Sequence, residues 1–73
     1  MFPNPLKKGE ALTIEVPTDE PFTVTIIDAT GHQVWQKNGC RSGRKIRPRL
    51  AKGTYLVVIK NKCVSLQSKL IQL

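Results

Sequence analysis

Apolar residues recur at every second position within short runs of this chain, and each run ends in a turn sequence. The run FTVTIID at 22–28 places Phe22, Val24 and Ile26 on one face, and ALTIEV at 11–16 alternates in the same way. A period of two is that of a β-strand, and the β-branched residues in these runs favour strand over helix. Because no segment has a convincing helical period, the pattern predicts an all-β fold.

Four further runs follow in the order HQVWQK, RKIRPRL, TYLVVIK and CVSLQSKLIQL, separated by the turns DATG, NGCRSG, AKG and NK. In HQVWQK we expect Val34 to face the core and Trp35 to face outward. Pro48 has no ladder donor, which indicates an edge strand for RKIRPRL. The 73 residues are enough for one domain, 1–73, with a thin core. Six or seven short strands predict a small antiparallel sandwich or barrel.

The run TYLVVIK is apolar on both of its faces. Tyr55, Val57 and Ile59 lie on one face, and Leu56 and Val58 lie on the other. We expect the first set to point into the core. An exposed apolar face usually marks a contact site, so the second set is a candidate for binding a partner.

Basic residues gather in the second half of the chain. Residues 1–36 carry two lysines and five acidic residues, whereas residues 37–73 carry ten lysines or arginines and no acidic residue. Such a segment attracts phosphates, anionic polysaccharides or lipid headgroups, and the candidate anion-binding residues are Arg41, Arg44, Lys45, Arg47 and Arg49. The alternative is a solvated edge whose charges prevent aggregation. Nucleic acid is not expected, because residues 41–52 contain no aromatic side chain for base stacking.

The two cysteines, Cys40 and Cys63, leave two alternatives open. A disulfide would stabilise the thin core by about 3 kcal/mol and would indicate an oxidising compartment. The alternative is two unpaired thiols. With His32 they make at most three soft ligands, whereas structural zinc takes four, so no metal is expected.

An enzyme is poorly supported by the sequence. The one histidine, His32, lies four residues after Asp28, but the two flank a turn, and no serine or cysteine at a suitable spacing completes a nucleophile. We therefore predict a non-catalytic domain without a cofactor.

Four motifs occur in order along the whole chain: PNP at 3–5, TIIDATGHQV at 25–34, LAKGTYLVVI at 50–59 and SKLIQL at 68–73. Together they resemble the C-terminal sorting domain of type IX secretion system cargo in Bacteroidetes. The matching positions, which we expect to be mostly determinants of the fold, are Pro3, Asn4, Pro5, Asp28, Gly31, Val34, Leu50, Gly53 and Tyr55, with Lys69 and Leu70 at the end. His32 stands where the family usually has arginine, and the basic segment and the cysteines are not part of the family pattern.

This resemblance implies an immunoglobulin-like β-sandwich that ends a longer secreted protein. The domain would cross the periplasm with its cargo, be read by the type IX translocon and shuttle proteins, and reach the outer membrane, the cell surface or the medium. A cell-surface sortase would remove it and couple the cargo to anionic lipopolysaccharide. The start MFPNPLKKGE lacks the features of a signal peptide, so we expect a domain excised from its parent protein.

A sorting signal shared by unrelated cargoes should act through its shape, its last strand and an exposed apolar patch. The candidate sorting and recognition residues are therefore Lys69, Leu70, Ile71, Gln72 and Leu73, together with Trp35, Leu56 and Val58. Two other arrangements remain open: a homodimer, and a retained module of a surface attachment complex that binds anions, glycans or lipopolysaccharide.

Overall fold

The computed structural model describes residues 6–73, so Pro3, Asn4 and Pro5 lie outside the described residues. The described chain forms six strands and no helix: β1 (Leu12–Thr13), β2 (Phe22–Asp28), β3 (Gln33–Cys40), β4 (Lys45–Ile46), β5 (Gly53–Lys60) and β6 (Ser65–Gln72). The all-β prediction is confirmed. No segment of residues 6–73 forms an apolar helix of the length that a membrane span requires.

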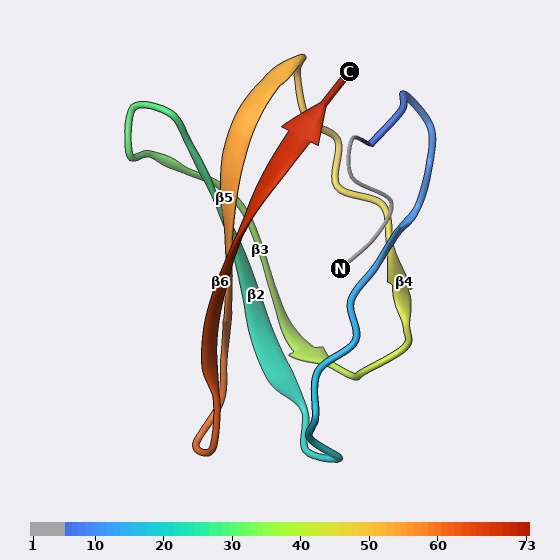
Figure 1. Cartoon of the computed structure of the whole chain (residues 1–73), viewed down its shortest axis with the longest axis vertical. Helices are drawn as coiled ribbons and strands as arrows, with labels where there is room; N and C mark the ends of the chain where they lie inside the picture. Colours follow the sequence, from blue (N-terminus) through green and yellow to red (C-terminus); the bar gives the residue numbers. More distant parts are fainter. Residues whose placement is uncertain (1–5) are drawn as a thin grey trace.

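The strands form two antiparallel sheets that face each other. A four-stranded sheet has the order β3-β2-β5-β6, and a smaller sheet pairs β1 with β4. Figure 1 shows the smaller sheet and its flanking segments lying across one face of the larger sheet. Between the layers lies the core, made of Leu6, Leu12, Ile14, Val16, Phe22, Val24, Ile26, Cys40, Ile46, Tyr55, Val57, Ile59 and Leu70. This arrangement is sandwich-like, as predicted.

Strands β2 and β5 form the centre of the larger sheet, and both follow the predicted alternation. In their antiparallel register Ile26 lies opposite Val57, and Val24 lies opposite Ile59. All four side chains are buried. Because directly opposed residues share a face of the sheet, this register forms one continuous apolar layer. The inward sets predicted for both strands are confirmed.

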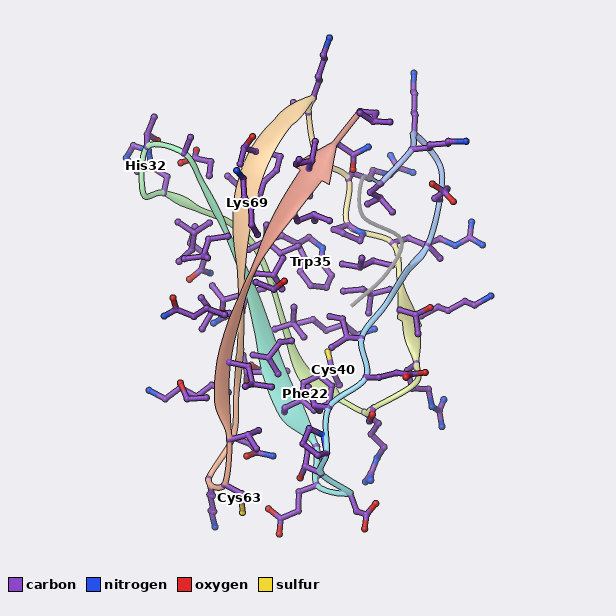
Figure 2. The ribbon with its side chains drawn as sticks, viewed as in Figure 1. Phe22, His32, Trp35, Cys40, Cys63 and Lys69 are labelled. Carbon is purple, nitrogen blue, oxygen red and sulfur yellow. The ribbon has the colours of Figure 1, made fainter. Side chains whose placement is uncertain are left out.

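Strand β3 departs from the prediction because it contains a β-bulge. Ile26 pairs with Trp35 but Ile27 pairs with Gln33, so Val34 is an extra residue with no partner of its own on β2. A bulge places two residues of one strand opposite one residue of the other and shifts the alternation. Val34 is exposed and Trp35 packs against the core, so the prediction for these two side chains was wrong. Figure 2 shows Trp35 between the layers.

The smaller sheet is shorter than the runs ALTIEV and RKIRPRL predicted. Only Leu12–Ile46 and Thr13–Lys45 are paired. Beyond these pairs, the loop before β4 supplies the hydrogen-bond partners. The Gly43 amide donates to the Ile14 carbonyl (2.8 Å), and the Val16 amide donates to Ser42 Oγ (2.9 Å). Leu12, Ile14 and Val16 are nevertheless buried as expected.

The reversal between β5 and β6 is longer than the two residues predicted. Asn61 Oδ1 accepts hydrogen bonds from the amides of Cys63 (2.7 Å) and Val64 (2.8 Å), and the Asn61 amide donates to the Val64 carbonyl (3.0 Å). An asparagine side chain that bonds the backbone two residues ahead makes an Asx-turn. The last strand therefore begins at Ser65 instead of Cys63.

Candidate functional site

The face of the larger sheet that points away from the smaller sheet carries an apolar patch. We call it the outer patch and define it by Ile27, Val34, Leu56, Val58 and Ile71. Ile27 on β2 lies opposite Leu56 on β5. Ile71 on β6 lies opposite Thr54, which is two residues before Leu56 on β5. Val34, Leu56 and Ile71 are 45%, 36% and 39% exposed, and the other two are half-buried. A contiguous apolar area at the surface of so small a domain is typical of a contact site.

The predicted recognition residues of the last strand divide between two faces. Leu70 and Gln72 are buried, whereas Lys69, Ile71 and Leu73 are exposed. Leu70 pairs with Tyr55 and joins the core. The side chains of Leu70 and Gln72 are therefore buried, and Trp35 is partly buried against the core, so none of the three belongs to the outer patch. Lys69 lies opposite Leu56, at the rim of the outer patch.

Strand β6 forms one edge of the larger sheet, and Leu6 covers the end of that edge. The Leu6 amide donates to the Ile71 carbonyl (2.7 Å), and the Leu73 amide donates to the Leu6 carbonyl (2.8 Å), which makes a parallel bridge between Leu6 and Gln72. Gln72 Nε2 also donates to the Leu6 carbonyl (3.2 Å). These bonds satisfy a buried amide side chain and hold the last strand in place.

Asp28 organises the turn between β2 and β3. Its Oδ1 accepts hydrogen bonds from the hydroxyl and amide of Thr30 (2.6 and 2.9 Å) and from the amide of His32 (3.0 Å). The hydroxyl bond, followed by the His32 amide bond, lowers the pKa of Asp28 below its ordinary value of 3.8. Gly31 adopts a φ of 91°, which glycine accepts without strain. Asp28 and Gly31 thus set the geometry of this turn.

His32 lies in the same exposed turn, at the end of the sheet where the chain terminates (Figure 2). Its Nδ1 is 2.8 Å from Thr30 Oγ1, whose single proton is already donated to Asp28. The imidazole must therefore donate to the hydroxyl from Nδ1. A histidine in this role cannot remove a proton from Thr30, so the turn contains no activated nucleophile.

Tyr55 closes the segment that leads into β5. The ring is buried, and the hydroxyl donates to the Ala51 carbonyl across 2.6 Å. Leu50 packs against the core from the same segment. Gly53 lies beneath the tyrosine, since a Cβ at this position would lie 3.8 Å from Tyr55 Cε2. Leu50, Gly53 and Tyr55 thus lie together where the chain enters β5.

The predicted anion-binding residues separate into two groups. Arg41 donates from Nη1 to the Asp19 carbonyl (3.2 Å), and with Arg44 and Lys45 it lines a hollow of about 300 Å³ beside Cys40. Arg47 and Arg49 line a larger groove of about 790 Å³, which Lys7 and Lys8 border from the start of the chain. The sequence analysis did not include these two lysines, because their contribution depends on the return of the N-terminal loop.

The two cysteines are free thiols in the structure, as in the second of the alternatives above. Cys40 ends β3 and is buried, and burial raises the pKa of its thiol. Cys63 is exposed in the turn between β5 and β6, and Figure 2 shows it at the tip of that turn. Among residues 6–73, no three His, Cys, Asp or Glu side chains come together in a way that could hold a metal ion.

Sequence reasoning missed Ile27 and Val34 as members of the outer patch, whereas Ile71 was among the predicted recognition residues. Ile27 could have been found from the sequence, because the period that directs Val24 and Ile26 inward directs Ile27 outward. Val34 could not be found in this way, since its direction depends on the bulge.

Comparison with known proteins gives one match. The family model described as the secretion system C-terminal sorting domain matches residues 1–72. No curated protein and no solved structure matches the chain.

Proposed function

The chain belongs to the secretion system C-terminal sorting domain family, and from this premise we propose that the type IX outer-membrane translocon reads its outer patch. The family gives the coarse role: a secretion-sorting signal of type IX secretion, whose protein is exported to the outer membrane, the cell surface or the medium. The finer steps belong to the proposal. They are transit of the periplasm, recognition by the translocon and its shuttle proteins, and transfer to a cell-surface sortase.

The exposure of the outer patch is the observation that carries this proposal. Leu56 is on a central strand, where both neighbours protect the backbone, and yet its apolar side chain remains at the surface. Exposing such side chains has a cost in solubility that a free-standing domain normally avoids. A partner that covers Leu56 and Ile71 removes this cost and gains their burial. Lys69 at the rim adds a charge that can fix the orientation of the partner.

Strand β6 provides a second element for recognition. Unlike β3, it pairs through all eight of its residues without a bulge. Leu6 already pairs with the end of this edge at Ile71 and Leu73, so a partner that adds a strand of its own would use the stretch at residues 65–67. The main-chain groups of an edge strand are the same for every sequence, which suits a receptor that must accept many cargoes. We place no catalytic step in the domain, because its one histidine acts as a donor within a turn.

The test uses a reporter directed to the periplasm of a type IX secretor and fused to residues 1–73. We expect the fusion to reach the cell surface or the medium. The double variant Leu56→Ser, Ile71→Ser should retain its circular dichroism spectrum but leave the reporter in the periplasm. Deleting the last five residues is a poorer test, since it removes Leu70 from the core and unfolds the domain.

Leu66→Ser is the matched control. Leu66 is also on β6 and is 42% exposed, but it lies opposite Ile59 and so belongs to the inner face. Export of this variant should be normal. Normal export of the Leu56→Ser, Ile71→Ser protein, or equal loss in the control, would contradict the proposal. A wild-type chain that sediments as a dimer which Leu56→Ser dissociates would assign the patch to a second copy instead.

A further inference from the structure

We propose that the groove between residues 7–10 and residues 47–51 binds an anionic polysaccharide. This inference is independent of the sorting role, because the groove lies at the smaller sheet and the outer patch lies on the opposite face of the larger sheet.

The segment from Lys45 to Leu50 alternates between exposed and covered side chains. Lys45, Arg47 and Arg49 are exposed, whereas Ile46 and Pro48 are buried and Leu50 is partly buried. The three cations therefore point away from the core. Arg47 and Arg49 line the groove, whereas Lys45 lines the hollow beside Cys40.

Two further cations line the groove together with Arg47 and Arg49. These are Lys7 and Lys8, and both are exposed. Glu10 also lines the groove, but its Oε1 accepts a hydrogen bond from the Lys7 amide (2.8 Å), so this carboxylate serves the turn. The balance of charge in the groove is positive. A volume of about 790 Å³ is large enough for several sugar units.

Arginine side chains suit an anionic polysaccharide for a reason beyond their positive charge. A guanidinium is planar and binds carboxylate, sulfate or phosphate through two parallel hydrogen bonds. A polysaccharide with one such group on each repeating unit presents its anions at regular intervals, and Arg47 and Arg49 offer two guanidinium groups that line the same groove.

Two other polyanions fit the surface less well. Binding of single-stranded nucleic acid uses exposed aromatic rings, but each aromatic side chain among the described residues, Phe22, Trp35 and Tyr55, is buried or packed against the core. Binding to a membrane surface combines basic and apolar side chains on one face. Here none of the exposed large apolar side chains among the described residues lines the groove; they are Val34, Leu56, Leu66, Ile71 and Leu73.

The test measures binding of the purified 73-residue chain to polygalacturonate and to dextran sulfate at two salt concentrations, with neutral dextran as the uncharged reference. We expect both anionic polymers to bind, with affinity that falls as salt rises, and the neutral polymer not to bind. The variant Arg47→Ser, Arg49→Ser should raise both Kd values by about tenfold or more, because each lost guanidinium removes charge-assisted hydrogen bonds.

The control is Lys60→Ser, Lys62→Ser, which removes the same charge at the turn between β5 and β6. We expect its Kd to change by no more than about twofold. Equal weakening by the two variants, binding of neutral dextran, or failure of both anionic polymers to bind would overturn the proposal. Tighter binding to single-stranded DNA or to vesicles of anionic phospholipid would also overturn it and would assign the groove to that ligand.

Discussion

The two faces of β5 have nearly the same composition and opposite surroundings. Tyr55, Val57 and Ile59 are buried against the smaller sheet, whereas Leu56 and Val58 remain partly accessible on the outer face. The same strand, with the same hydrogen bonds to β2 and β6, supports both sets. Hydrophobicity in the sequence therefore does not distinguish a residue that stabilises the fold from one that is available to a partner. The distinction depends on whether another part of the fold covers the residue.

The two faces of β5 also differ in the free energy that they have gained on folding. Burial of an apolar side chain contributes roughly 25 cal/mol for each Å² removed from water. The inner face has already gained this free energy in the folded domain. The outer patch has gained only part of it, and the remainder is available when a partner binds. Substitutions on the two faces should therefore separate stability from recognition.

The largest expected effect comes from truncating a leucine on each face. Leu70→Ala leaves a cavity in the core and should lower the free energy of unfolding by about 2–5 kcal/mol, whereas Leu56→Ala should lower it by less than about 1 kcal/mol. Urea unfolding followed by circular dichroism measures both. If Leu70→Ala does not fold, Ile26→Val and Ile71→Val give the same contrast at about 1 kcal/mol against a few tenths. Equal losses on the two faces would remove the distinction.

The bulge in β3 provides the next contrast, between adjacent residues. Trp35→Ala should cost about 2 kcal/mol because the indole packs against the core, and Val34→Ala should cost less than about 0.5 kcal/mol because Val34 is exposed. Thermal unfolding of the two variants measures the difference. A larger loss for Val34→Ala would mean that the strand has the unbulged phase.

A smaller effect is expected at the hydroxyl of Tyr55. Tyr55→Phe keeps the buried ring but removes the hydrogen bond to the Ala51 carbonyl, which should cost about 1 kcal/mol. Chemical denaturation of the variant measures the change. No loss of stability would show that the hydroxyl does not hold the segment before β5, and that the ring alone accounts for this motif position.

The smallest effect concerns pH and the turn at Asp28. The hydrogen bonds from Thr30 and His32 hold the pKa of Asp28 below its ordinary value of 3.8. A carboxylate with a lowered pKa in the folded state contributes stability above its unfolded pKa and loses that stability as pH falls through the folded value. Wild type should therefore lose more stability between neutral and strongly acidic pH than Asp28→Asn does. Parallel pH profiles of the two proteins would contradict this assignment.

The sequence was sufficient where side-chain alternation alone decides the structure. The inward sets of β2 and β5 follow from a period of two, and so does the sandwich that buries them. The sequence was insufficient where a single residue shifts the alternation of a strand or lengthens a turn. The bulge at Val34 depends on pairing with β2, and the length of the turn after β5 depends on the Asn61 side chain.

The candidate site was predicted only in part for a related reason. Leu56 and Val58 could be assigned to the outer face from the pattern, but the last five residues were treated as one unit although they alternate. The burial of Gln72 could not be predicted from the alternation, because this polar side chain is buried through its hydrogen bond to the Leu6 carbonyl, 66 residues earlier in the chain. Likewise, Lys7 and Lys8 join Arg47 and Arg49 only in the folded chain.

The bridge between Leu6 and Gln72 bears on when this domain can fold. It joins residues 66 positions apart, and β5 obtains its second neighbour only from the last strand. Leu6 is synthesised long before Gln72, so residues near the start of the described chain have no partner until the last strand has been made. Closing long loops late in the chain also slows folding. We therefore expect the domain to fold after this segment has been translated and not during its translation.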